Sequence, residues 1–567
     1  MTALYLERFM NYGITPDELR CGKPIVGIAQ SGSDIAPCNR IHLELADRIK
    51  AGIRDSGGIP MEFPMHPIFE NCRRPTAALD RNLAYLGLVE ILNGYPIDAV
   101  VITTGCDKTT PAGIMAASTV DIPAITLNGG PMLDGWHEGE LVGSGTVIWR
   151  SRRKLAAGEI DEAEFMSRAA DSAPSAGHCN TMGTASTMNA VSEALGMSLP
   201  GNAAIPAPYR ERAQMAYETG RRAVELAYED LRPSKILTRE SFLNAIRTVT
   251  AIGGSSNAQP HIVAMARHAG VEIRPEDWME HGYDLPLLVD MQPAGRFLSE
   301  RFHRAGGVPA VMWELLEAGV LDGSQMSVTG RTLADNVEGR ETGDREVIRP
   351  FSKPLRERAG FLVLRGNLFD FAIMKTSVIS EDFRRRYLSE DGCFEGRAIV
   401  FDGSDDYHHR INDPALGIDE NCILVIRGAG PLGWPGSAEV VNMQPPDHII
   451  QRGIASLPTL GDGRQSGTSD SPSILNASPE SAAGGGLSWL RTGDTIRIDL
   501  EAGRCDALVD EAEIARRRTE PRPPIPESNT PWEELYREKT GQLSEGGALE
   551  FAVKYRGTST KTPRHNH

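Results

Sequence analysis

Apolar residues in the first part of the chain follow two different spacings. Ile41, Leu45, Ile49 and Ile53 recur every four residues, and this period predicts a helix with one apolar face. Residues 99–102 form a short unbroken apolar run, which is typical of a strand buried on both faces of a parallel sheet. The two spacings together indicate that helices and buried strands alternate here.

The run at 99–102 leads into a polar loop, and Pro111 then opens a stretch with helical character. Residues 122–127 predict the next strand. This strand–loop–helix order implies a doubly wound α/β domain. Ligands of such sheets bind beyond the carboxyl ends of the strands, so the loop after residue 102 is a candidate site.

The pattern changes after about residue 350, where helical periodicity fades and glycine, proline and short strands dominate. Residues 422–426 predict a buried strand, and Ile496, Ile498 and Leu500 alternate with polar residues before a turn. This pattern of short strands and turns predicts a β-rich domain that is barrel-like.

A chain of 567 residues is longer than one hydrophobic core usually serves. The fold class is therefore predicted as α/β, with a doubly wound α/β domain over residues 1–350 and a β-barrel-like domain over residues 351–567. Residues 516–532 carry many Arg, Pro and Glu and are expected to form an exposed excursion.

Charge narrows the classes of partner. The formal net charge of -17 repels phosphate groups, which argues against nucleic acid and anionic membranes. An anionic substrate would therefore need a local cationic site such as a metal. No stretch has the length of a membrane span, and no signal peptide is evident, so we expect a cytoplasmic protein whose eight cysteines are thiols or ligands rather than disulfides.

Three cysteines share one kind of setting. Cys38, Cys106 and Cys179 each lie in a loop of small and polar residues just before a helical stretch. A thiolate there is exposed, is favoured by the helix N-terminus and is free to bind metal. Three such loops suggest one iron–sulfur cluster with an iron left open for substrate. The alternative is that each is a reduced thiol without a role, and the wide spacing by itself is a weak signal.

Carboxylates near these loops suggest a second, harder metal. Asp107 follows Cys106 directly, and Glu70 and Glu439 lie in Pro-containing or Gly/Pro-rich segments; such oxygens suit Mg²⁺. Taken singly, acids such as Glu70 and Glu439 are more often solvated surface residues, and Asp107 is equally well explained as a helix cap. Lys108 is an unusual neighbour for metal ligands unless its charge is neutralised or modified.

Ser466 lies in a glycine-rich segment, Gly461-Asp-Gly-Arg-Gln-Ser-Gly-Thr, where the backbone can approach a ligand closely. The alternative is a plain loop serine. The chain contains no Gly-x-Ser-x-Gly elbow, Walker loop or dinucleotide fingerprint, so hydrolase, ATP and nicotinamide chemistry are not supported.

Four of these segments resemble the dihydroxy-acid dehydratase / 6-phosphogluconate dehydratase family. They are Ala-Pro-Cys38-Asn, Thr-Gly-Cys106-Asp-Lys-Thr-Thr-Pro, Gly-His-Cys179-Asn-Thr-Met-Gly-Thr-Ala-Ser and Gly-Arg-Gln-Ser466-Gly-Thr. The order and spacing match across nearly the whole chain. The segments around Glu70 and Glu439 are most similar to the branch that acts on sugar acids, in particular D-xylonate.

The resemblance implies a role for each residue. Cys38, Cys106 and Cys179 would hold a [2Fe-2S] cluster. Mg²⁺ would be held by Glu70, Asp107 and Glu439, with Lys108 carbamylated into an anionic ligand. Ser466 would be the catalytic base, assisted by Thr468. The family also implies an α/β domain followed by a β-barrel, and a homo-oligomer, either a dimer or a tetramer.

The activity implied is that of a hydro-lyase, which converts a sugar acid to a 2-keto-3-deoxy acid and water. D-xylonate is the expected substrate, with L-arabinonate, gluconate or a branched dihydroxy acid as alternatives. A non-catalytic iron–sulfur sensor or carrier is a third reading. It is disfavoured because such sites usually have four protein ligands, whereas three cysteines here lie in suitable loops.

Overall fold

The computed structural model describes residues 3–70, 73–74, 77–389, 392–521 and 524–557. Within the first part, four parallel strands form a sheet in the order β2-β1-β3-β4. Their bounds are β1 (Ile25–Gln30), β2 (Ile59–Pro64), β3 (Ala99–Thr104) and β4 (Ala124–Asn128). β1, β3 and β4 are buried along their whole length, as the unbroken apolar run at 99–102 predicts.

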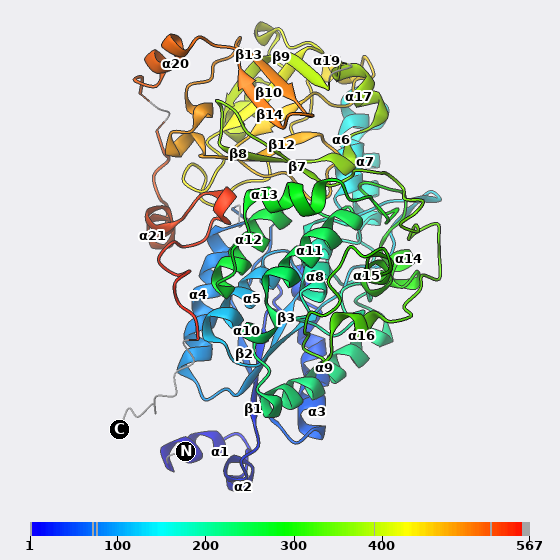
Figure 1. The fold of residues 1–567 in the computed structure, drawn as a ribbon, viewed down its shortest axis with the longest axis vertical. Helices are drawn as coiled ribbons and strands as arrows, with labels where there is room; N and C mark the ends of the chain where they lie inside the picture. Colours follow the sequence, from blue (N-terminus) through cyan, green and yellow to red (C-terminus); the bar gives the residue numbers. More distant parts are fainter. Residues whose placement is uncertain (1–2, 71–72, 75–76, 390–391, 522–523, 558–567) are drawn as a thin grey trace.

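Helices cover both faces of this sheet (Figure 1). α3 (His42–Asp55) packs on α9 (Arg210–Glu229), and α4 (Leu79–Gly94) packs on α5 (Thr109–Val120). The chain passes from β1 to β2 on one side and then returns past β1 to β3 and β4 on the other, and α3 lies on one face of the sheet while α4 and α5 lie on the other. The predicted doubly wound arrangement is confirmed.

The topological switch point of the sheet lies between β1 and β3. Both strands end at the same edge, and the loops that leave them carry Cys38 and Cys106. Open α/β sheets bind ligands at such a crevice because adjacent loops diverge there. The fold itself therefore brings two of the three predicted cluster cysteines to the same place.

The other elements of the first part are mostly helical. They are α1 (Ala3–Met10), α2 (Pro16–Arg20), η1 (Pro37–Asn39), β5 (Trp136–His137), β6 (Glu140–Leu141), α6 (Thr146–Ala157), α7 (Glu162–Asp171), α8 (Thr184–Ala194), α10 (Pro233–Ile236), α11 (Arg239–Ala251), α12 (Ala258–Ala269), α13 (Pro275–Trp278), η2 (Met279–Tyr283), α14 (Ser299–Arg304), α15 (Gly307–Glu317) and α16 (Leu333–Val337).

The second part is built on an eight-stranded mixed sheet in the order β14-β13-β9-β10-β11-β12-β8-β7. Its two ends approach each other, because Arg365 beyond β7 exchanges backbone hydrogen bonds with Gly503 and Cys505 of the β14 region. This nearly closed sheet confirms the predicted barrel-like architecture. The strands are β7 (Phe361–Leu364), β8 (Phe371–Lys375), β9 (Cys393–Asp402), β10 (Cys422–Arg427), β11 (Thr459–Gly461), β12 (Ser473–Ser478), β13 (Thr495–Asp499) and β14 (Arg504–Ala507).

Short helices connect these strands or follow the last of them, and they are more numerous than the fading periodicity predicts. They are η3 (Thr376–Val378), α17 (Glu381–Tyr387), α18 (Ser404–Arg410), η4 (Pro414–Leu416), α19 (Asp447–Ile450), η5 (Ser481–Ala483), η6 (Gly486–Ser488), α20 (Glu511–Arg517), α21 (Pro531–Lys539) and η7 (Leu543–Glu545). Most have fewer than eight residues, which is too short for a repeating apolar face to show.

The last described segment, which ends at residue 557, returns to the first part of the molecule (Figure 1). The described residues of the predicted excursion between α20 and α21 are largely exposed. α21 then packs on α4, where the Trp532 indole donates to the Leu79 carbonyl at 3.1 Å and Glu533 pairs with Arg74 at 2.6 Å. No helix among the described residues is long and apolar enough to cross a membrane.

A buried lysine joins the two parts. Lys375, the last residue of β8, is 3% exposed, and its ammonium donates to the Gly253 carbonyl at 2.8 Å. Burial lowers the pKa of Lys375 to about 7. The unfolded chain therefore binds more protons than the folded protein between about pH 7 and the ordinary lysine value, so the destabilisation that this lysine causes fades as pH rises through that window.

We predict that Lys375→Met is more favourable for stability at pH 7 than at pH 9. The variant-minus-parent difference in unfolding free energy should fall by about 2 kcal/mol between the two pH values, because the parent recovers stability as Lys375 loses its proton. Urea unfolding at both pH values measures this. Lys235→Met is the matched control, since Lys235 makes the same 2.8 Å bond to a carbonyl but is exposed. A difference for Lys375→Met that does not change with pH would contradict the assignment.

Candidate active site

The three predicted cluster cysteines all lie directly before helices. Cys38 lies in η1 before α3, Cys106 precedes α5, and Cys179 precedes α8. The first two loops are joined, because the Asn39 side-chain carbonyl accepts a hydrogen bond from the Cys106 amide at 2.7 Å. Gly105 permits this approach, since a Cβ there would lie 2.7 Å from Asn39 Oδ1.

The three thiols converge. The nearby Cys38 thiol, followed by burial, raises the pKa of Cys106 well above its ordinary value. Burial, and then the nearby Cys38, raise the pKa of Cys179 to about 12. The Ser144 hydroxyl donates to Cys179 Sγ at 3.4 Å. Residues widely separated in sequence thus place three sulfur atoms in one neighbourhood.

The expectation of an exposed thiol with a lowered pKa is wrong for Cys106 and Cys179. Cys106 is only 5% exposed, and Cys38 and Cys179 are partly buried. Burial and clustering of sulfur atoms outweigh the favourable helix N-terminus. A cation bound among them would reverse this effect, because metal binding displaces the thiol proton.

Predicted hard ligands surround Lys108. Its side chain is fully buried, and its ammonium donates to a Glu70 carboxylate oxygen and, at 2.5 Å, to Asp107 Oδ2. Burial alone would lower the pKa of Lys108, but the Asp107 and Glu70 carboxylates outweigh it and raise that pKa. Asp107 does not cap α5: the N-cap residue is Lys108, without a side-chain capping bond.

Glu439 reaches the same place from the second part of the chain. Burial raises the pKa of Glu439 to about 7, although the Arg464 guanidinium opposes this. The Glu70 and Asp107 carboxylates also raise the pKa of Glu439, and the Lys108 ammonium lowers it. All four groups therefore lie in one electrostatic cluster. The surface-acid interpretation of Glu70 and Glu439 is therefore wrong.

Two residues of this cluster escaped the sequence analysis. Arg464 is fully buried and donates to Glu70 at 2.9 Å and to Glu439 at 3.1 Å. The Asn257 side-chain amide donates to Glu439 at 2.8 Å. The signal available for Arg464 was its position two residues before Ser466 in the same glycine-rich segment. Asn257 lies in a serine-rich turn before α12, which carries no such signal.

Ser466 lies on the loop after β11 and is partly exposed. Its hydroxyl lies 2.8 Å from the Thr468 hydroxyl, and the Thr468 amide donates to Ser466 Oγ at 3.4 Å. The loop is close to the thiols, because Ser144 contacts Cys179 while its neighbour Gly145 lies against Thr468. The loop also lies near the carboxylates, because the Asn257 amide that binds Glu439 donates to the Gln465 carbonyl at 3.1 Å.

Two donor sets of different hardness meet at adjacent residues. The Cys106 thiol donates to Asp107 Oδ1 at 3.0 Å, so one sulfur and one carboxylate of the two sets share one loop. The sulfur set suits iron, and the oxygen set suits Mg²⁺. The three carboxylates lie against two buried cations, Lys108 and Arg464. If the lysine charge were removed, the remaining negative charge would fit a divalent metal.

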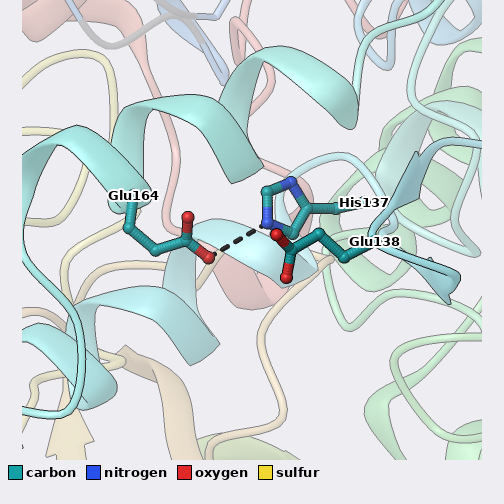
Figure 2. Close-up of side chains that lie close together, drawn as sticks. All are labelled: His137, Glu138 and Glu164. Carbon is teal, nitrogen blue, oxygen red and sulfur yellow. Dashed lines mark hydrogen bonds and ion pairs between the residues drawn. The ribbon is translucent and has the colours of Figure 1, made fainter.

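A further group of possible ligands lies apart from this cluster. Figure 2 shows the His137 ring directed at the Glu164 carboxylate, with Glu138 alongside. Both ring nitrogens are engaged, with Asp171 at 2.8 Å and Glu164 at 3.0 Å, and Arg168 donates to the same Glu164 oxygen at 2.7 Å. Because both ring nitrogens of His137 are already hydrogen-bonded to carboxylates of α7, this group is explained as a clasp between the β5–β6 hairpin and α7.

Sequence comparisons decide the family. Residues 23–336 match the profile of the dihydroxy-acid/6-phosphogluconate dehydratase N-terminal domain, and residues 346–547 match that of its C-terminal domain. The chain belongs to the dihydroxy-acid/6-phosphogluconate dehydratase family. It is therefore a dehydratase, a hydro-lyase, and the family resemblance seen in its motifs is confirmed.

Relatives within this dehydratase family act on sugar acids. The chain is 76% identical to a D-xylonate dehydratase of Caulobacter vibrioides, covering 100% of this chain and 96% of the relative. It is 42% identical to an L-arabinonate dehydratase of Rhizobium leguminosarum, covering 97% and 94%. It is 34% identical to a 6-deoxy-6-sulfo-D-gluconate dehydratase of Pseudomonas putida, covering 96% and 93%.

Proposed function

We propose that this dehydratase converts D-xylonate to its 2-keto-3-deoxy acid and water. The observation that carries the proposal is the junction at Cys106 and Asp107, where three thiols and three carboxylates meet beside a paired serine and threonine. The 76% identity to a D-xylonate dehydratase supports the choice of substrate.

We propose a cofactor for each of the two donor sets. Cys38, Cys106 and Cys179 would hold a [2Fe-2S] cluster, and Glu70, Asp107 and Glu439 would hold Mg²⁺. Lys108, once carbamylated, would add an anionic oxygen in place of its buried ammonium. When bound, these groups act as Lewis acids toward the substrate's hydroxyl and carboxylate oxygens.

In the proposed reaction the chain supplies the proton acceptor. Ser466 Oγ takes the proton from C2 as the bond between C3 and its hydroxyl breaks. Ser466 then passes this proton to the leaving hydroxide, which departs as water, and the enol becomes the ketone as its hydroxyl proton moves to C3. A neutral alcohol is a weak base, so Ser466 must act as an alkoxide held by nearby donors and positive charge. The Thr468 hydroxyl, 2.8 Å away, is placed to donate to that alkoxide.

The chain is proposed to divide at residue 350 and to act as a cytoplasmic homo-oligomer, a dimer or tetramer. All seven cysteines among the described residues are free thiols, which suits a reducing compartment. Cys72 lies outside the described residues. Light scattering of the purified protein measures the oligomeric state.

The test of substrate compares sugar acids directly. Reconstituted protein is incubated with D-xylonate, L-arabinonate and D-gluconate, with and without Mg²⁺, and the 2-keto-3-deoxy product is measured. We expect the highest kcat/KM for D-xylonate and loss of turnover without Mg²⁺. Higher kcat/KM for L-arabinonate would favour the second candidate, which the 42% identical relative supports. A coloured protein inert on every acid would favour a sensor or carrier.

A further inference from the structure

Helix α6 is hydrogen-bonded to the loop that carries Ser466 and Thr468. Three of its residues, spaced three and four apart, lie on one helical face and contact this loop. The Thr146 hydroxyl donates to the Thr468 carbonyl at 3.1 Å, the Trp149 indole donates to the Thr468 hydroxyl at 3.0 Å, and the Arg153 guanidinium makes two 3.0 Å bonds to Asp470. In Figure 1 this helix, cyan, reaches from the first part of the chain up beside the C-terminal sheet.

The side chain of Thr468 has almost no freedom in this contact. A Cβ at Gly145 would lie 2.4 Å from Thr468 Oγ1, and one at Gly183 would lie 2.9 Å from its Cγ2. The absence of side chains at these two glycines is what allows the threonine to lie between α6 and α8. The hydroxyl is thus packed in one place rather than rotating in a solvated loop.

The chemistry of the indole then fixes the direction of the hydrogen bonds. An indole N–H can only donate, so Thr468 Oγ1 must accept from Trp149. A deprotonated Ser466 can only accept, so the Thr468 proton must point at Ser466 Oγ. The chain Trp149–Thr468–Ser466 therefore runs in one direction, and each donor polarises the next bond.

We propose that Trp149 is a positioning residue for the dehydration: its indole N–H orients and polarises the Thr468 hydroxyl, which in turn stabilises the Ser466 alkoxide. The inference rests on the proposed role of Ser466 as base. It adds a residue from a helix of the first part of the chain, 317 positions before Ser466, to the machinery of proton removal.

Trp149→Phe tests this by removing the N–H while keeping an aromatic ring in place. We expect kcat to fall about 10-fold, as for loss of one hydrogen bond that acts in the transition state, with KM for D-xylonate changed less than about twofold. The kinetic isotope effect with C2-deuterated substrate should rise, because proton removal becomes slower relative to other steps. Melting temperature and cluster absorption should stay as in the parent.

Two further variants make the result decisive. Trp136→Phe is the matched control, because Trp136 is 58% exposed on the β5–β6 hairpin, and it should keep the parent kcat. Thr468→Val should lower kcat by itself, and adding Trp149→Phe to it should cost less than about twofold, since Trp149 acts through the threonine hydroxyl.

The outcomes separate this inference from the function on which it rests. Parent-like kcat in Trp149→Phe, or a full 10-fold loss in the Thr468→Val background, would overturn the role of Trp149 alone. Retained turnover in Ser466→Ala would instead overturn the proposed base. If another sugar acid proves to be the substrate, the same ratios are measured with that acid.

Discussion

Replacing Ser466 by alanine is expected to lower kcat about 1,000-fold or more while leaving the protein folded and its iron–sulfur absorption intact. A positioned general base typically contributes two to four orders of magnitude, and no other hydroxyl lies within hydrogen-bond distance of Thr468 Oγ1 among the described residues. Alanine fits the space, because it removes one oxygen from a partly exposed side chain. Turnover of D-xylonate and the visible spectrum measure both parts of the prediction.

The matched control for this variant is Ser56→Ala. Ser56 is a partly exposed serine at the end of α3, far from the ligands, and its change should leave kcat within about twofold of the parent. Loss of the visible absorption in Ser466→Ala would show that the serine supports the cluster rather than the proton transfer. Parent-like turnover would remove Ser466 from the mechanism.

The sequence was most informative for elements whose burial requires a regular spacing of apolar residues. The apolar run at 99–102 became the central strand β3, and the four-residue period of Leu45, Ile49 and Ile53 became the buried face of α3. Both signals arise because burial on two faces or on one stripe demands a fixed spacing. The short helices between the barrel strands have no such repeat, so their periodicity was invisible.

The residues of the site also differ in whether the sequence could predict them. Residues with rare chemistry in unusual loops, such as Cys38, Cys106 and Cys179, were detectable because thiols before helices are informative by themselves. Asn257 and Trp149 act only through their contacts with Glu439 and Thr468. Those contacts exist only once the two parts of the chain are packed together, and no local pattern encodes them.

The burial of the thiols also could not be read from the loops. Small polar residues around Cys106 suggested exposure, yet Asn39 and Gly105 close the loop over it. The result is a cysteine whose pKa is raised by the nearby Cys38 and by burial, so a metal bound there would have to displace its proton. The proposed cluster would therefore set the charge state of the site.

For that reason Cys106→Ser is expected to abolish both the cluster and the turnover. A serine hydroxyl is far less acidic than a thiol and binds iron poorly, and burial makes its anion still less favourable. Iron per chain and absorption in the visible range should fall to background, and kcat should fall below detection. The fold should survive, because serine replaces cysteine with little change of volume and the Cys106 amide keeps its bond to Asn39.

Cys21→Ser is the matched control, since Cys21 is exposed just after α2 and has no link to the ligands. It should retain full iron content and turnover. A Cys106→Ser protein with parent-like absorption and iron would remove this sulfur from the ligand set. A protein that loses the cluster but keeps its melting temperature would show that the switch-point loops are preorganised by Asn39 and Gly105, and that the metal supplies chemistry rather than the fold.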